Sequence, residues 1–491
     1  MRARSLLLTP VVLAVLGLLA PRAMAQSTGV LSISPESGPS GTSFSVSGNT
    51  VAGGGTVDIQ WTTWDGTYST ETTPTTVAYH QRAFTQKRVS LGRVIADANG
   101  HFEGTFTAPE DFGQVHEIHS VVDGQDQGRG GFQEQMAGTA TPTSGPIGTP
   151  IHIHITGLDT DLFSGSTLAV RYDNAYTGLL TAATTHGTAD AVIRASGALG
   201  AHSIFVGAGT LPAYLNIHQS PYDFLYAHLP GGEGFSFTFN TTADPGPPPT
   251  STEWPSPDAV QTLLPDAPRT TLEELAPSTA SLNLEPTSGP ILTTTHLSAS
   301  GLTPGDPATV VFMTARGNRV SDTGWDLQPL QIGTGQPDAN GNLNMDVQVP
   351  DDLGGWHELR LVQDNLSAAQ APFYVERSLV SVTPERPKVG DTVIIHAKGL
   401  GWTELDNGFA VTYDNMFVGY ACGFNSNGDV TMPLIATGGP GTHLIDLYPM
   451  VYNGQDKKAW YWAPVLTFAQ DFPALSLGYR LPAFHLAISS V

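Results

Sequence analysis

A short phrase occurs four times along the chain, and this repeat constrains the fold more than any other feature. The copies are Pro35-Glu-Ser-Gly-Pro-Ser-Gly-Thr42, Pro142-Thr-Ser-Gly-Pro-Ile-Gly-Thr149, Pro286-Thr-Ser-Gly-Pro-Ile-Leu-Thr293 and a degraded copy, Pro384-Glu-Arg-Pro-Lys-Val-Gly-Asp391. Each copy leads into an apolar run that ends at a glycine, namely Gly48, Gly157, Gly301 or Gly399. A unit that recurs in this way predicts an array of similar domains.

The apolar pattern within each unit predicts β-strands. Apolar and polar residues alternate in Ser43-Phe-Ser-Val-Ser47 and Ile151-His-Ile-His-Ile155, and Val393-Ile-Ile-His-Ala397 is a similar short run. A period of two is typical of half-buried antiparallel strands. Helical periodicity is nearly absent, and 54 Gly and 37 Pro supply turns between the strands. The sequence therefore predicts an all-β protein built from tandem immunoglobulin-like β-sandwiches.

The predicted modules are of two kinds, A and B, and the A–B pair is duplicated. An A module carries Asp-Ala-Asn-Gly and then Pro-x-Asp-x-Gly-x-x-His, whereas a B module carries Tyr-Asp-Asn and then Gly-x-His. Equivalent positions such as Asp97 and Asp338 are 241 residues apart. We therefore predict four modules, with a linker between the pairs and a tail at the end: A1 at 27–136, B1 at 137–242, the linker at 243–280, A2 at 281–377, B2 at 378–472 and the tail at 473–491.

The linker and the tail differ in composition. The stretch from Asp244 to Ala280 holds nine prolines and six acidic residues, so it predicts a semi-extended linker at which proteolysis would release two folded halves. The tail carries apolar residues from Leu475 to Ile488. We expect it to pair with a sandwich edge, either in its own chain or in a second copy, where it would cause self-association.

The composition limits where the protein can reside and which molecules it can bind. Residues 1–25 read as a secretory signal peptide, and no later stretch is apolar enough to insert into a membrane. Cys422 is the one cysteine, so no intramolecular disulfide can form, which is typical of a bacterial exported protein. Removing three of the 21 basic residues with the signal leaves 18 against 44 acidic ones. We expect a secreted or cell-surface protein that does not bind nucleic acid or insert into membranes.

The repeated phrase resembles the opening strand and turn of the IPT/TIG family of immunoglobulin-like domains. The resemblance covers the start of each module and, through the strand pattern, residues 27–472. The doubled glycine that the family places before the threonine is missing, and the fourth copy has lost Ser-Gly-Pro. The resemblance implies extracellular binding or spacing modules and does not identify a ligand.

Four histidines, one in each module, invite a metal or acid–base interpretation. They are His116, His202, His357 and His443, and each follows a glycine at the entry to an apolar strand. This position matches the corner of immunoglobulin sandwiches, at which a polar ring bonds back to the backbone. We expect structural residues here, and we expect no metal and no cofactor. No nucleophile–base motif is present, so the sequence does not predict an enzyme.

Aromatic residues are the candidate ligand-binding residues. Trp460, Tyr461 and Trp462 precede the expected last strand of B2, and Tyr222, Phe224 and Tyr226 occupy the corresponding region of B1. Such rings can form a platform for sugars or peptides, or they can pack against the neighbouring A module. A second set is Trp61, Trp64 and Tyr68, in a stretch that makes A1 longer than A2. Four nearby cations could bring this region to an acidic partner: Arg82, Lys87, Arg88 and Arg93.

These features together predict a non-enzymatic binding or structural protein, secreted or held at the cell surface, with a role in adhesion or in the envelope or matrix. Its expected partner is a cell-surface or extracellular protein or a polysaccharide. The principal alternative is a carbohydrate-binding protein that uses the aromatic faces of the B modules. The second alternative is an unrecognised hydrolase.

Overall fold

β-Strands dominate the part of the chain that the computed structural model describes. The described residues are 29–50, 53–72, 77–160, 167–208, 234–255, 280–318, 324–423, 426–451 and 463–491. Their strands form eight sheets, four of three strands and four larger ones, and each small sheet packs on a larger one. The predicted all-β class is confirmed.

In both A modules a three-stranded sheet faces a larger sheet. In A1 the orders are β2–β4–β7 and β1–β9–β8–β5–β6, with β3 on β9, and in A2 they are β19–β21–β24 and β20–β26–β25–β22–β23. The A1 strands are β1 (Gly29–Val30), β2 (Ser32–Ser34), β3 (Ser37–Gly38), β4 (Ser43–Asn49), β5 (Thr56–Thr72), β6 (Val77–Ile95), β7 (His101–Thr107), β8 (Val115–Val122) and β9 (Gln125–Glu134). The A2 strands are β19 (Ser281–Glu285), β20 (Ser288–Pro290), β21 (Thr294–Ser300), β22 (Ala308–Asn318), β23 (Gly324–Gly335), β24 (Leu343–Gln348), β25 (Gly355–Gln363) and β26 (Leu366–Glu376).

The B modules repeat this plan. In B1 the orders are β10–β12–β15 and β11–β17–β16–β13–β14, and in B2 they are β27–β28–β31 and β18–β33–β32–β29–β30. The B1 strands are β10 (Ala137–Thr141), β11 (Ser144–Gly145), β12 (Pro150–Thr156), β13 (Thr167–Tyr172), β14 (Ala175–Thr181), β15 (Ala189–Arg194), β16 (Gly200–Ala208) and β17 (Phe235–Thr241). The B2 strands are β18 (Ser251–Glu253), β27 (Ser378–Thr383), β28 (Thr392–Lys398), β29 (Gly408–Tyr413), β30 (Met416–Cys422), β31 (Val430–Ile435), β32 (Gly441–Pro449) and β33 (Ala483–Ser490).

The repeated phrase lies where the chain crosses from the small sheet to the large one. A Cβ on Gly38 would lie 2.4 Å from Oγ1 of Thr42, and the second and third copies are equally tight, with 2.4 Å at Gly145 and 2.5 Å at Gly289. Glycine is therefore required because the threonine side chain packs directly on the backbone. In the fourth copy Pro387 and Asp391 stand at these two positions.

The A–B pair has the same close junction in both halves. A Cβ on Gly113 would lie 1.7 Å from the carbonyl oxygen of Gly157, and one on Gly354 would lie 1.7 Å from that of Gly399. The N–H of Gly113 also donates to the Leu158 carbonyl at 3.1 Å. The duplication has thus copied the contact between the two modules together with the modules themselves.

The C-terminal residues correct the predicted B2 boundary. Strand β33 pairs antiparallel with β32 from Leu447↔Phe484 to Gly441↔Ser490, and it is an inner strand of the large B2 sheet. The expected edge pairing within the same chain is confirmed. However, 473–491 is not a tail outside the module, because Phe484, Leu486 and Ile488 fill the B2 core.

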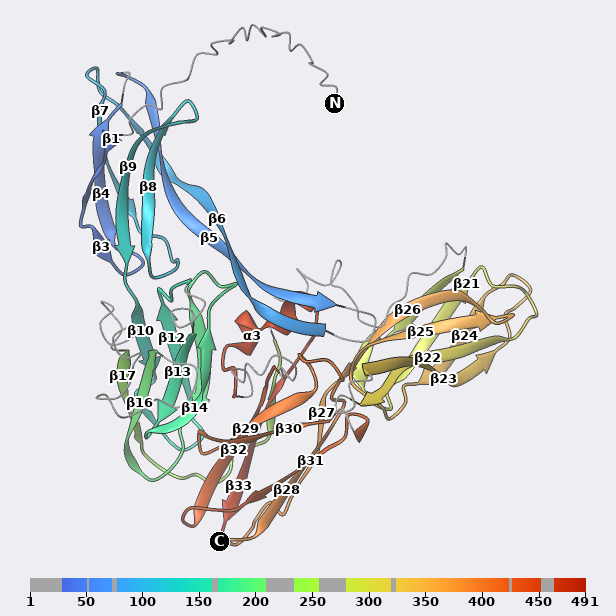
Figure 1. Ribbon diagram of the computed structural model, residues 1–491. Coiled ribbons are helices and arrows are strands. Elements are labelled where there is room, and N and C mark those ends of the chain that lie inside the picture. Colours follow the sequence, from blue (N-terminus) through green and yellow to red (C-terminus); the bar gives the residue numbers. More distant parts are fainter. Residues whose placement is uncertain are drawn as a thin grey trace, which may run out of the picture.

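The residues before β33, here called the hub segment (463–482), are almost wholly buried. They contain helix α3 (Phe468–Asp471) and the 3₁₀ helix η4 (Pro473–Leu477). Their apolar side chains join one continuous core with residues of all four sandwiches, for example Tyr79, Leu180 and Tyr374. Figure 1 shows α3 at the centre of the molecule, between B1, B2 and the long β5–β6 hairpin of A1.

The β5–β6 hairpin, here called the arm, explains why A1 is longer than A2. Its strands have 17 and 19 residues, against 11 and 12 for the equivalent β22 and β23. The arm leaves the A1 sandwich and crosses the centre of the molecule (Figure 1). The Tyr79 N–H donates to Oε2 of Glu404, 3.1 Å away in the loop that precedes β29. The extra length therefore reaches the second half of the chain.

The linker prediction is also corrected over its described part. Residues 244–255, here called the Pro-rich segment, dock on B2, because β18 pairs antiparallel with β33 from Ser251↔His485 to Glu253↔Ala483. The Asp244 carboxylate accepts hydrogen bonds from the N–H and the hydroxyl of Thr442, at 2.9 and 2.6 Å. The rest of the predicted linker, 256–279, lies outside the described residues.

Candidate functional site

The aromatic residues singled out in the sequence do not form a platform where the structure describes them. Trp61 is fully buried, donates to Oδ2 of Asp111 at 2.8 Å and stacks on His116. Trp64 is half-buried against the same imidazole, and Tyr68 is buried in the hub core. Trp61 and Tyr68 therefore present no exposed ring to a ligand. The B-module aromatics lie outside the described residues, namely Tyr222, Phe224, Tyr226, Trp460, Tyr461 and Trp462.

The four cations of the arm have partners in their own chain. Lys87 pairs with Asp65, Arg88 with Asp126 at 2.8 Å, and Arg93 with Asp58 at 3.7 Å. The buried Arg82 donates to the Thr167 hydroxyl in B1 at 2.7 Å. These residues meet acidic and polar groups within the molecule, so they give no indication of an acidic ligand.

The corner histidines have the structural role expected from the sequence. In each module Nε2 lies within hydrogen-bond distance of the carbonyl oxygen four residues earlier, at 2.6 Å for His116, 2.7 Å for His202, 2.8 Å for His357 and 2.8 Å for His443. The other nitrogen meets a carbonyl oxygen in the A modules and an aspartate in the B modules. Within the described ranges, no three His, Cys, Asp or Glu residues form a metal-binding group.

Replacing a corner histidine should destabilise its module. His357 is fully buried, and it stacks on Phe312 with ring centroids 4.3 Å apart. His357→Ala removes this contact and leaves the Met313 and Leu353 carbonyls without their partner. We expect a loss of about 1–3 kcal/mol in the free energy of unfolding, measured by denaturant titration. Unchanged stability, or zinc that binds stoichiometrically and is lost with the substitution, would contradict the structural role.

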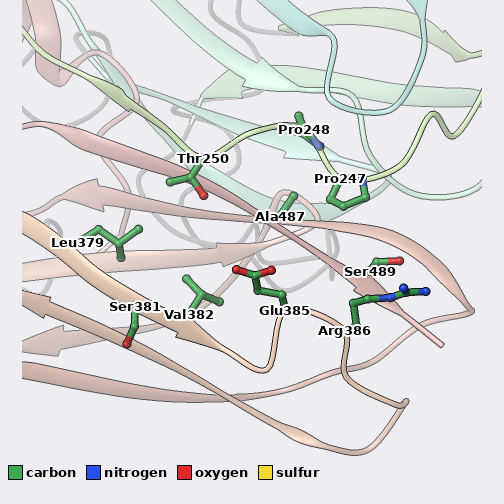
Figure 2. Close-up of a pocket in the computed structure, with 10 residues that line it drawn as sticks. All are labelled: Pro247, Pro248, Thr250, Leu379, Ser381, Val382, Glu385, Arg386, Ala487 and Ser489. Carbon is green, nitrogen blue, oxygen red and sulfur yellow. The ribbon is translucent and has the colours of Figure 1, made fainter.

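A pocket of 590 Å³ opens where the Pro-rich segment crosses the edge of the B2 sandwich. Figure 2 shows the two prolines and Thr250 on one side, β27 residues on the other, and β33 residues between them. The lining residues are Pro247, Pro248, Thr250, Leu379, Ser381, Val382, Glu385, Arg386, Ala487 and Ser489. Its volume lies within the range of about 300–1,000 Å³ that is usual for ligand sites.

The degraded fourth phrase forms one end of this pocket. Arg386 stands where the other copies have Ser37, Ser144 and Ser288, and Glu385 precedes it. In the sequence alone this divergence indicates only a loss of the family pattern, and its place in the pocket becomes visible in the structure. The divergence was a usable signal, because the one copy that differs is the copy that lines the pocket.

A buried charge network holds the Pro-rich wall of the pocket in place. His485 of β33 lies between two carboxylates, with Nδ1 2.6 Å from Asp446 and Nε2 3.2 Å from Glu253 of β18. Arg194 of B1 is 2.7 Å from the same Asp446 oxygen, and Tyr448 contacts the imidazole edge-on. The network therefore ties three parts of the chain together: the Pro-rich segment, B2 and B1.

The surroundings shift the pKa values of His485 and Asp446. Burial opposes a charge on His485, but the hydrogen bonds to Asp446 and Glu253 outweigh it and raise the pKa of His485 to about 9. Burial likewise opposes ionisation of Asp446, but Arg194 and His485 hold the pKa of Asp446 below its usual value. At neutral pH His485 is thus a charged imidazolium that contacts the ionised carboxylate of Asp446.

This network predicts a loss of stability at alkaline pH. An imidazole in the unfolded chain titrates near pH ~6.5, so charged His485 stabilises the fold fully below that pH and by about 2–3 kcal/mol at pH 7. The contribution should disappear as the pH rises through about 9. We expect the difference in melting temperature between the wild-type chain and His485→Gln to shrink between pH 7 and pH 10. Melting curves that stay the same distance apart over this range would contradict the assignment.

Comparisons with known proteins do not assign a function to this chain. No protein-family model and no curated protein matches the chain. A mutant alpha-2-macroglobulin from Salmonella aligns with 95% of this chain at 9% identity and a TM-score of 0.17, and this chain spans only 31% of that protein. The adhesin InvE of Yersinia pseudotuberculosis aligns with 53% of this chain and 66% of its own length, at 13% identity and a TM-score of 0.14. A membrane-anchored protein from Corynebacterium diphtheriae aligns with 70% of this chain and 90% of its own length, at 11% identity and a TM-score of 0.17. At these TM-scores the similarities give no functional argument.

Proposed function

We propose that this chain is a secreted or cell-surface-associated protein without enzymatic activity, which holds a binding surface in a fixed position and acts in adhesion or in the envelope or matrix. The observation that carries the proposal is the hub segment, which contacts all four sandwiches. The Asp471 carboxylate meets Tyr68 of A1 and Thr184 of B1, and the Arg480 backbone meets the Tyr374 hydroxyl of A2. Such contacts set the relative positions of the modules, as a scaffold requires.

The hydrogen bonds of the buried histidines support the non-enzymatic part of the proposal. The corner histidines are the natural candidates for acid–base chemistry, and both nitrogens of each ring meet a backbone carbonyl or an aspartate of the same module. The His485 network joins modules in the same way. Groups engaged in this manner hold the fold together and are not free to move protons on a substrate.

We further propose that the modules are IPT/TIG-like and that the partner is a cell-surface or extracellular protein or a polysaccharide. The packing of threonine on glycine in three copies of the opening phrase supports the first point. The net charge of −23 supports the second, because it repels nucleic acid and anionic membranes. Within the described residues no helix is long and apolar enough to cross a bilayer. The site that would meet the partner is the pocket beside the Pro-rich segment.

Fractionation of the producing cells tests this function directly. We expect the protein in the culture medium or in the surface fraction released by mild washing, and we expect the purified chain to bind the envelope of intact cells. Recovery only from the cytosol would overturn the proposal. A hydrolytic activity that co-purifies with the chain would overturn its non-enzymatic part and favour the hydrolase alternative.

A further inference from the structure

The pocket lies at the open side of the B2 sandwich, between the edges of its two sheets. On the small sheet the outer strand is β27, which pairs with β28 alone in the described part of the chain. On the large sheet β33 is covered at one end by β18 and at the other by the backbone of Glu385 and Pro387. Ala487 lies between these two covers, the Ser489 N–H donates to the Glu385 carbonyl at the second cover, and both residues line the pocket.

This side of the module already accepts an extended segment of chain. Strand β18 comes from the Pro-rich segment, more than 120 residues before β27, and adds itself to the edge of β33. Strand β27 lies across the pocket from Pro247, Pro248 and Thr250 of the Pro-rich segment, and Val380 within it is 51% exposed. Edge strands with unpaired backbone groups are sites at which extended peptides add as further strands.

Resting on the proposed function, we propose that an extended peptide segment of an extracellular partner protein binds here as an added strand on β27, with alternate side chains in the pocket. Strand β27 has six residues, which gives a partner strand enough length for several backbone hydrogen bonds. Because side chains alternate along a strand, every second residue of the partner would point into the pocket.

The residues that line the pocket determine which peptide side chains it can accept. Leu379, Val382 and Pro248 present apolar surface for an aliphatic side chain, and hydroxyl groups of serine and threonine flank them. None of the ten lining residues is aromatic, so the pocket lacks the ring platform on which sugars stack. The net charge of −23 favours a peptide that is neutral or basic.

The charged residues at one end of the pocket would set the orientation in which the peptide binds. Glu385 and Arg386 are exposed neighbours, and within the described residues neither side chain takes part in an ion pair. A basic group of the peptide would pair with Glu385 and an acidic group or the chain terminus with Arg386. The other sandwiches have serine in place of Arg386, so this end is particular to B2.

Selection of a displayed library of random seven-residue peptides on the full-length chain tests the proposal. Ser381→Arg fills the pocket from an exposed position on β27, and Thr139→Arg makes the same change at the equivalent exposed position of B1. We expect enriched peptides with alternating aliphatic residues, a Kd at least tenfold weaker for Ser381→Arg, and an unchanged Kd for Thr139→Arg. Both variants should melt like the wild-type chain, and bound peptide should slow amide hydrogen exchange in β27.

Two results would overturn this inference. The first is a selection that enriches no peptide, or only peptides that bind Ser381→Arg as tightly as the wild-type chain. The second is glycan binding, measured on a polysaccharide array, that Ser381→Arg abolishes while no peptide competes. The second result would assign the pocket to a polysaccharide and leave the proposed surface role intact. Failure of the proposed function would instead appear in the fractionation, whatever the pocket binds.

Discussion

A chain that ends at residue 472 should fail to fold its fourth sandwich. Such a truncation removes β33, which pairs with β32 over seven residue pairs and lies inside the large B2 sheet. It also removes the core side chains Phe484, Leu486 and Ile488, which are at most 3% exposed.

The size of the loss follows from the buried area. Burying a large apolar side chain contributes about 1.5–3 kcal/mol, so the three core side chains contribute about 5–9 kcal/mol. This is comparable with the whole stability of an ordinary domain, about 5–15 kcal/mol. The loss of seven residue pairs of strand pairing adds to it, so the module should not remain folded.

Calorimetry of the truncated and full-length chains gives the measurement. We expect the truncated chain to lose part of its unfolding enthalpy and to become protease-sensitive between residues 378 and 449. The matched control removes only Val491, which is 53% exposed, and should melt like the full-length chain. If the truncated chain keeps the full unfolding enthalpy, β33 is dispensable and the corrected B2 boundary is wrong.

Asp471→Ala should give the largest effect of any single substitution in the hub segment. The Asp471 side chain is 1% exposed and accepts hydrogen bonds from the Ala183 N–H at 2.8 Å and from the N–H and hydroxyl of Thr184 at 2.6 and 2.7 Å. The Tyr68 hydroxyl lies 2.9 Å from the same carboxylate. Burial raises the pKa of Tyr68 well above its usual value, so this hydroxyl keeps its proton and donates it.

The substitution leaves these donors buried without an acceptor. Leaving a buried donor without an acceptor costs about 1–3 kcal/mol, and because several donors lose their acceptor here the total should be about 3–5 kcal/mol. We expect this loss in the free energy of unfolding, together with faster hydrogen exchange in the arm. The control is Asp190→Ala, which removes a carboxylate that is 53% exposed and should change stability by about 0–1 kcal/mol. Equal effects of the two substitutions would show that the Asp471 contacts do not join the modules.

The sequence predicted the local elements well because each rests on short-range chemistry. Alternation in Ser43–Ser47 and Ile151–Ile155 predicts strands that the structure contains, and the histidine corners follow from one glycine and one apolar strand. Glycine in the repeated phrase is explained by a threonine four residues away. In each case the interacting groups lie close in sequence or within one module.

The contacts between modules could not be predicted in the same way. The hub segment has no clear period of two or 3.6, so its apolar residues indicated burial without showing what would cover them. Proline content indicated an isolated linker, although three residues, Ser251–Glu253, pair with a strand more than 200 residues away. The pocket depends on the second of these contacts, because the docked Pro-rich segment supplies Pro247, Pro248 and Thr250 to its wall, and only the divergence at Arg386 gave a local sign of it.

Separation of the two halves tests the central claim, that the modules form one body around the hub segment. Asn415 of B2 donates to the Arg194 carbonyl and to the Ser196 hydroxyl of B1 at 2.7 and 2.8 Å, and the arm of A1 reaches the hub. The measurement is the native mass after complete cleavage at a protease site inserted between Asp266 and Ala267. We predict that both fragments elute together at the mass of the uncut chain. Two separate species, each with the mass of one A–B pair, would contradict the account.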